Sequence, residues 1–174
     1  MVRINEHEEL TVIRELTPHH FHLVAEWLSN PEINCWLTGD WRDKAATSTR
    51  VAMLVRNKRN RVFLVHFNDQ PCGLAALADI DDADKTAMVW YFLGDSTLSG
   101  RGITATAVKQ LAAISFRQMG LSSLYAWVVE DNQASKRVLI KAGFREVGRI
   151  RRATLSRGRR VDRVYFDLVA EEVI

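Results

Sequence analysis

The stretch Phe92-Leu93-Gly94-Asp95-Ser96-Thr97-Leu98-Ser99-Gly100-Arg101-Gly102-Ile103-Thr104 joins two different hydrophobic patterns. The apolar run 87–93 before it predicts a strand, and apolar residues at helical spacing predict a helix from Gly102 to about Met119. A helix start leaves backbone N–H groups unpaired and carries partial positive charge. Glycines let the backbone approach a ligand closely. The order of strand, glycine-rich turn and helix therefore predicts a phosphate-binding loop, although Gly-x-Gly alone also fits a plain flexible turn.

The composition indicates a soluble globular protein. The chain has 174 residues, 47% of them hydrophobic and 26% charged, which predicts one domain over residues 1–174 with a loose polar segment at 1–9. The charged N-terminus does not resemble a signal peptide, and no segment approaches the roughly 20 apolar residues of a membrane span. We therefore expect a cytoplasmic protein without a membrane partner. Cys35 and Cys72 show neither metal-ligand nor disulfide-framework spacing, so we expect free thiols and no metal.

Hydrophobic periodicity and turn residues predict alternating strands and helices. The expected strands cover residues 9–16, 61–67, 73–80, 86–93, 124–129 and 144–147, followed by a hairpin of 148–154 and 161–170. The expected helices run from Thr17-Pro18 to Ser29, from about 43 to 56, from 102 to about 119 and from 133 to 142. An irregular aromatic segment is expected over 33–41. This order predicts an α/β or α+β fold.

Positive charge gathers near the C-terminus, although the net charge is only +3. Eleven Lys and Arg residues lie between Lys136 and Arg163, against the acidic Glu146 and Asp162. This segment is either a solvated basic face or a surface that attracts a phosphate-bearing cofactor or an acidic macromolecule. Phe144 is the one aromatic residue in this part of the sequence, which argues against nucleic acid as a partner.

Two segments of the sequence resemble a known family. The segments 99–107 (SGRGITATA) and 132–144 (NQASKRVLIKAGF) are similar to the phosphate loop and to the N-x-x-S … K-x-G-F segment of the GNAT acetyltransferases. The segment 161–166 (VDRVYF) near the C-terminus resembles the last hairpin of the ribosomal-protein N-terminal acetyltransferase-like branch. The resemblance implies a single-domain fold with a mixed, mostly antiparallel sheet of roughly six to seven strands, splayed at the cofactor site and flanked by about four helices.

The same resemblance implies acetyl-CoA as acyl donor and direct transfer of the acetyl group to a primary amine. Ser135 is the expected catalytic residue, because a CoA thiolate would be stabilised at the start of a helix, and a plain helix-start serine is the alternative. Asn132 is also a good N-cap for that helix on structural grounds alone. The implied cofactor-binding residues are Phe92, Leu93, Gly100, Arg101, Gly102, Ile103, Thr104, Trp127, Val128, Asn132, Ser135 and Arg137.

The sequence departs from the family at four positions. Ser99 stands where Gln or Arg is common, and Thr104 where Gly or Ala is common. Leu139 replaces a tyrosine that serves as general acid in many members, and Trp127 stands where another branch has a glutamate base. The proton acceptor for the amine is therefore left open among four side chains on strand ends, which are His66, Asp79, Glu130 and Asp131.

The acceptor pocket implied by the resemblance draws on the first two helices and the last hairpin. Trp36, Trp41, His66 and Tyr165 with nearby arginines would line it, which suits an anionic acceptor such as an amino acid, a protein N-terminus or a nucleotide-linked amino sugar. Two alternatives stay open: an acyltransferase for an amino sugar or antibiotic-like molecule, and a catalytically silent module that binds CoA or nucleic acid. A monomer and a homodimer are both compatible with the sequence.

Overall fold

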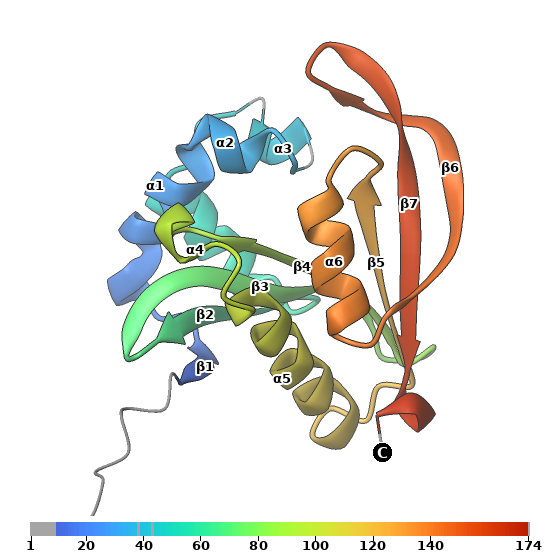
Figure 1. The fold of residues 1–174 in the computed structure, drawn as a ribbon. Helices are drawn as coiled ribbons and strands as arrows, with labels where there is room; N and C mark the ends of the chain where they lie inside the picture. The colour runs from blue at the N-terminus through green and yellow to red at the C-terminus, as the bar shows by residue number, and fades with distance from the viewer. Residues whose placement is uncertain (1–9, 38, 43, 174) are drawn as a thin grey trace, which may run out of the picture.

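The computed structural model describes residues 10–37, 39–42 and 44–173, so the loose segment expected at 1–9 lies outside the described residues. Within this part, seven strands form one sheet in the order β1-β2-β3-β4-β5-β7-β6 (Figure 1). The strands are β1 (Thr11–Glu15), β2 (Arg61–Phe67), β3 (Gln70–Asp81), β4 (Thr86–Leu93), β5 (Ser123–Val129), β6 (Arg145–Ser156) and β7 (Arg159–Val169). The α-helices are α1 (Phe21–Ser29), α2 (Pro31–Asn34), α3 (Gly39–Arg42), α4 (Ser48–Arg56), α5 (Ile103–Arg117) and α6 (Gln133–Lys141). The 3₁₀ turns are η1 (Pro18–His20), η2 (Ser96–Leu98) and η3 (Ala170–Glu172).

The centre of the sheet opens into a wedge between β4 and β5. These two strands are parallel and joined through α5, and they pair only where Thr86–Met88 faces Ser123–Tyr125. Beyond Met88 and Tyr125 they separate, while β4 stays paired with β3 and β5 with β7. All other strand pairs in the described sheet are antiparallel. The predicted fold class and the splayed, mostly antiparallel sheet are therefore confirmed.

Helices cover both faces of the sheet (Figure 1). On one face, α5 and α6 bury apolar side chains in a cluster with β4, β5 and β7, which includes Val108, Leu111, Leu139, Val89, Leu124 and Phe166. On the other face, α1 and α4 pack on β2 and β3 through a second cluster, which includes Val24, Leu28, Val51, Leu64 and Leu74. Burial of these side chains stabilises each layer by about 1.5–3 kcal/mol per large residue. The two layers leave the wedge between β4 and β5 accessible at one end.

The segment between α1 and β2 differs from the sequence prediction. The region expected to be irregular contains two single-turn helices, α2 and α3. Asn30 caps α2, because its side chain accepts the N–H of Glu32 at 3.0 Å, so Asn30-Pro31 both ends α1 and starts a new turn. The next helix is shorter than predicted. It starts at Ser48 because Thr47 caps it by accepting the N–H of Arg50, whereas the predicted start at Asp43 lies outside the described residues.

The C-terminal end of the sheet also corrects the prediction. The expected strand 144–147 and the first strand of the last hairpin form one strand, β6, with irregular register between Glu146 and Gly148 and between Ile150 and Thr154. A bulge bends a strand without ending it, which the sequence pattern cannot distinguish from a break. The turn at the hairpin tip is as predicted, with Arg157 and Gly158 at φ 47° and 76°.

Candidate active site

The main cavity of the described structure occupies the wedge and has a volume of about 580 Å³. Its walls come from the separating ends of β4 and β5, the start of α5, the start of α6 and the short helix α2. The cavity-lining residues include eleven of the twelve predicted for the cofactor: Phe92, Leu93, Gly100, Gly102, Ile103, Thr104, Trp127, Val128, Asn132, Ser135 and Arg137. The fold thus brings together residues that lie far apart in the sequence.

The glycine-rich turn leaves open space at the start of α5. Gly100 and Gly102 adopt φ +84° and +80°, and no atom lies within 4 Å of the position that a Cβ would take at either. Gly102 is the N-cap of α5, so the N–H groups of the first helical turn follow it directly. Asp95 supports the turn by accepting the backbone N–H and the hydroxyl of Thr97. The open space and the free helix start suit a pyrophosphate.

Arg101 is the predicted cofactor residue that does not line the cavity. Its guanidinium lies 4.6 Å from the ring centre of Phe67, at the end of β2. Two other cations, Arg137 and Lys141 of α6, do line the cavity. A phosphate outside the wedge would therefore meet α6 rather than the Arg101 side chain.

The start of α6 holds the predicted catalytic residue. Asn132 caps this helix, since its Oδ1 accepts the N–H of Ser135 at 3.0 Å, as predicted. Tyr91 of β4 reaches across to the same residue: its Oη lies 2.8 Å from the Oγ of Ser135 and 3.0 Å from its carbonyl oxygen. Burial raises the pKa of Tyr91 well above its ordinary value, although the hydrogen bond to Ser135 opposes the rise. Tyr91 also lines the cavity.

The sequence did not single out Tyr91. It stands between Trp90 and Phe92 in an apolar strand, where an aromatic residue is typical of a core. Its partner lies 44 residues away, so only the fold brings the two hydroxyl groups together. No local pattern carries that signal.

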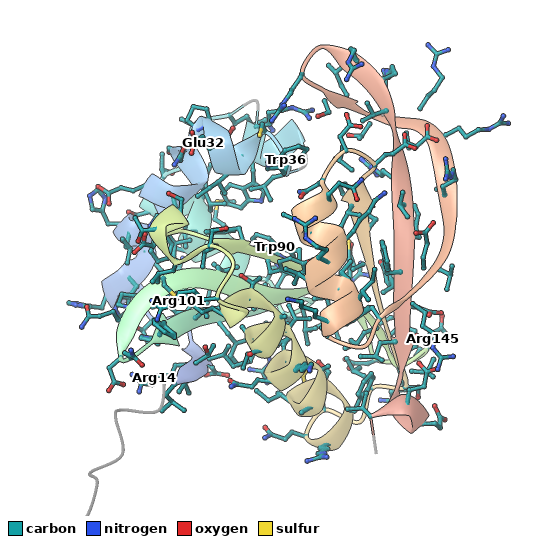
Figure 2. All side chains as sticks on the ribbon, in the orientation of Figure 1. Arg14, Glu32, Trp36, Trp90, Arg101 and Arg145 are labelled. Carbon is teal, nitrogen blue, oxygen red and sulfur yellow. The ribbon has the colours of Figure 1, made fainter. Side chains whose placement is uncertain are left out.

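Four tryptophans line the cavity. They are Trp36, Trp41, Trp90 and Trp127, and Figure 2 shows Trp36 in the turn after α2 and Trp90 on β4. Three of them carry an arginine on one ring face. The guanidinium carbons of Arg157, Arg50 and Arg163 lie 4.9, 4.5 and 4.0 Å from the rings of Trp36, Trp41 and Trp127. We call these the arginine–tryptophan pairs.

Two of the residues predicted for the acceptor pocket lie elsewhere. His66 is buried at 6% exposure and faces the ring of His20 at 6.3 Å, at the edge of the sheet with β1 and β2. Tyr165 is opposite Trp127 on β7 but outside the cavity lining. The sequence predicted that His66 lies on a strand, but not which face of the strand its side chain occupies. His20, at the start of α1, lies against the His66 ring. Trp36 and Trp41 are placed as predicted.

None of the four side chains considered as proton acceptors is among the residues that line the cavity. Glu130 contacts Arg149 at 3.4 Å, Asp131 lies 3.6 Å from Arg159, and Asp79 is exposed at a register shift of β3. Within the described lining, Glu32 of α2 is the one carboxylate. The sequence did not indicate Glu32, because Asn30-Pro31 is typical of the end of a helix.

Comparison with known proteins decides the family. The model of the acetyltransferase (GNAT) domain matches residues 11–145. The chain belongs to the GNAT acetyltransferase family. Among curated relatives, the putative ribosomal N-acetyltransferase YdaF of Bacillus subtilis is 24% identical over 178 residues, which covers 98% of this chain and 95% of the relative. The resemblance drawn from the two sequence segments is thereby confirmed.

Solved structures of GNAT acetyltransferases share the fold. The spermidine N-acetyltransferase of Vibrio cholerae in complex with CoA and spermine has a TM-score of 0.83 at 18% identity, over 94% of this chain and 97% of that one. The ribosomal L7/L12 alpha-N-protein acetyltransferase RimL in complex with CoA has a TM-score of 0.81 at 18% identity, over 93% and 95%.

As a GNAT protein the chain is an acyltransferase, and acetyl-CoA is its acyl donor. The residues present fit that donor, since the cavity offers an open glycine cradle at one end of the wedge and two cations on α6. None of the helices in the described ranges is long and apolar enough to cross a membrane. Cys35 and Cys72 are free thiols, and burial together with Asp95 raises the pKa of Cys72 to about 11.

Proposed function

We propose that this protein transfers the acetyl group of acetyl-CoA to a primary amine whose acceptor molecule also carries negative charge, such as an acidic protein N-terminus or an amino-acid-like metabolite. The observation that carries this proposal is the set of arginine–tryptophan pairs, in which the tryptophans line the cavity and the arginines stack on them from outside its lining. We further propose that residues 1–174 act as one acetyltransferase domain. The two free thiols agree with a cytoplasmic location.

The arginine–tryptophan pairs favour an anionic over a polycationic acceptor. A bare indole face attracts a cationic amine, but three of the four cavity tryptophans already have a guanidinium within 4.0–4.9 Å of the ring centre. A polyamine would bring further positive charge next to these arginines, and each such contact costs on the order of 1 kcal/mol near water. Glu32 alone, within the described lining, offers a compensating negative charge.

Arg163 adds a second argument for negative charge on the acceptor. Its Nε is buried and has no hydrogen-bond partner among the described residues, while its guanidinium covers Trp127. A buried N–H without an acceptor costs about 1–3 kcal/mol. A carboxylate or phosphate near Trp127 would reduce this cost, whereas an ammonium group would not.

The chemistry assigned to the site is direct transfer. The amine must lose a proton before it attacks, and we assign this proton to Glu32, either directly or through water. The amine nitrogen then bonds to the acetyl carbon while the bond from that carbon to sulfur breaks, and the electron pair of that bond stays on sulfur. The Ser135 hydroxyl and the positive end of α6 stabilise the sulfur anion. The remaining proton on nitrogen leaves to solvent.

A thiol-release assay with acetyl-CoA and a panel of amines tests this function. The panel contains an acidic N-terminal peptide, an amino acid, an amino sugar, a nucleotide-linked amino sugar and spermidine. We expect turnover with acceptors that carry a carboxylate or phosphate. Turnover confined to the neutral amino sugar or to spermidine would contradict the anionic acceptor. Calorimetric binding of CoA without thiol release on any amine would show a silent CoA-binding module instead.

A further inference from the structure

We propose that Tyr91 is the positioning residue for Ser135: its phenolic O–H donates to the Ser135 Oγ and so leaves the serine proton free for the sulfur of the donor. This inference rests on the acetyl transfer proposed above and deepens it. Tyr91 itself exchanges no proton with the substrate. It is therefore distinct from the tyrosine acid of other family members, whose position here is the fully buried Leu139.

The position of Tyr91 in the wedge makes the contact possible. β4 is paired with β5 only as far as Met88, so Tyr91 lies where the strands have separated. Its side chain spans the gap to the first turn of α6 and meets Ser135 Oγ at 2.8 Å, the usual length of an O–H···O bond. Because the Ser135 N–H is held by Asn132, the residue is fixed from β4 and from its own helix cap.

The hydrogen-bond accounting leaves two arrangements, since each hydroxyl has one proton. In the first, Tyr91 donates to Ser135 Oγ, and the serine proton points elsewhere. In the second, Tyr91 donates to the Ser135 carbonyl oxygen at 3.0 Å, and the serine donates to Tyr91. That carbonyl already accepts the intrahelical N–H of Leu139, as in any α-helix, so it does not need the tyrosine. Without a bound donor, the second arrangement makes both contacts, whereas the first leaves the serine proton without an acceptor until the sulfur of acetyl-CoA supplies one.

Two features keep Tyr91 a hydrogen-bond donor. Burial raises its pKa well above the ordinary value, so the phenol keeps its proton throughout the pH range of the reaction. Among the described residues, the Ser135 Oγ has Tyr91 as its hydrogen-bond partner. As the carbon–sulfur bond breaks, the electron pair moves to sulfur and the serine O–H stabilises it. The charge is balanced by the proton that the amine loses to Glu32 or water.

Kinetics of three variants test the inference: Tyr91→Phe, Ser135→Ala and the double variant. Loss of one hydrogen bond of about 1 kcal/mol predicts that Tyr91→Phe lowers kcat about fivefold with little change in the KM for acetyl-CoA. The double variant should be no slower than Ser135→Ala, because Tyr91 acts only through Ser135. Tyr125→Phe removes a phenol from β5 outside the cavity lining and is the matched control.

Binding supplies a readout that does not depend on turnover. The wild type should bind CoA more tightly than desulfo-CoA by calorimetry. Tyr91→Phe should reduce the ratio of these two affinities several-fold. The thermal midpoint of Tyr91→Phe should stay near that of Tyr125→Phe. An unchanged ratio, an unchanged or raised kcat, or multiplying effects in the double variant would each overturn the inference. Absence of thiol release by the wild type would instead refute the proposed function, and the inference with it.

Discussion

At the scale of single residues, comparing Gly102 with Gly120 distinguishes an effect on ligand binding from an effect on backbone conformation. Gly102 and Gly120 both have positive φ, +80° and +67°, and open space at the Cβ position, but only Gly102 lines the cavity. Alanine strains both positions by about 1 kcal/mol. We expect Gly102→Ala and Gly120→Ala to lower the thermal midpoint by similar amounts, and only Gly102→Ala to weaken acetyl-CoA binding by calorimetry. Equal acetyl-CoA affinities of Gly102→Ala and Gly120→Ala would show that the glycine-rich turn does not bind the donor.

Glu32 supports a second prediction at this scale. If Glu32, the carboxylate in the described lining, takes the proton of the amine as proposed, Glu32→Gln should lower kcat/KM for the acceptor by at least a hundredfold at neutral pH. Glu26→Gln on α1, an exposed carboxylate next to His22, is the matched control. A wild-type kcat/KM in Glu32→Gln would mean that solvent takes the proton.

Single residues also show which parts of the site can be predicted from the sequence. Gly102, Asn132 and Ser135 were predicted because each signal lies within one turn or one helix start, where backbone geometry restricts the residue type. Tyr91 and Glu32 were not predicted. Their roles depend on partners or walls that come from other elements, and their local surroundings are typical of a core strand and a helix end.

At the scale of elements, the hairpin of β6 and β7 reaches the helices on the other side of the cavity. Arg42 of α3 donates to the Leu155 carbonyl oxygen, and Arg157 at the hairpin tip covers Trp36, which follows α2. Figure 1 shows the tip beside α3, above the opening of the wedge. The hairpin therefore brings positive charge next to a tryptophan of the cavity wall.

Removing that charge should affect the acceptor and not the donor. We expect Arg157→Ala to raise the KM for an anionic acceptor several-fold and to leave the KM for acetyl-CoA unchanged. Arg160→Ala removes the same charge from an exposed position on the same hairpin, so it controls for net charge. If the two substitutions raise the KM for the anionic acceptor equally in steady-state kinetics, the effect comes from the net charge of the protein and not from the arginine–tryptophan pair.

The elements themselves were predictable to different degrees. β4, β5 and α6 appeared within about one residue of the expected bounds, because clear turn and cap signals flank them. The strand β6 was divided in two by its bulges, and the one-turn helices α2 and α3 were missed. Such elements depend on tertiary contacts more than on a repeating pattern.

At the scale of the whole molecule, His66 links stability to pH. It is 6% exposed, its Nδ1 has no hydrogen-bond partner among the described residues, and burial together with Arg14 lowers its pKa below 6.5. The folded state thus prefers the neutral ring, whereas the unfolded state binds a proton near pH 6.5. The stabilising effect is complete above pH 6.5 and is lost as the pH falls toward the lower pKa of the folded state.

We therefore expect the free energy of unfolding in urea to decrease between pH 7 and pH 5, and His66→Phe to reduce this slope. The ring volume is kept and the titrating group is removed. His22→Phe, at an exposed position on α1, should keep the wild-type slope. The same slope in His66→Phe and the wild type would show that other groups carry the pH dependence.

The most direct test of the central claim compares two acceptors that differ only in charge. One peptide has acidic residues next to a free N-terminus, and the other has the corresponding amides. With saturating acetyl-CoA, we predict at least a tenfold higher kcat/KM for the acidic peptide, with a gap that closes as salt rises because the charges are screened. An equal or higher kcat/KM for the amide peptide would contradict the account.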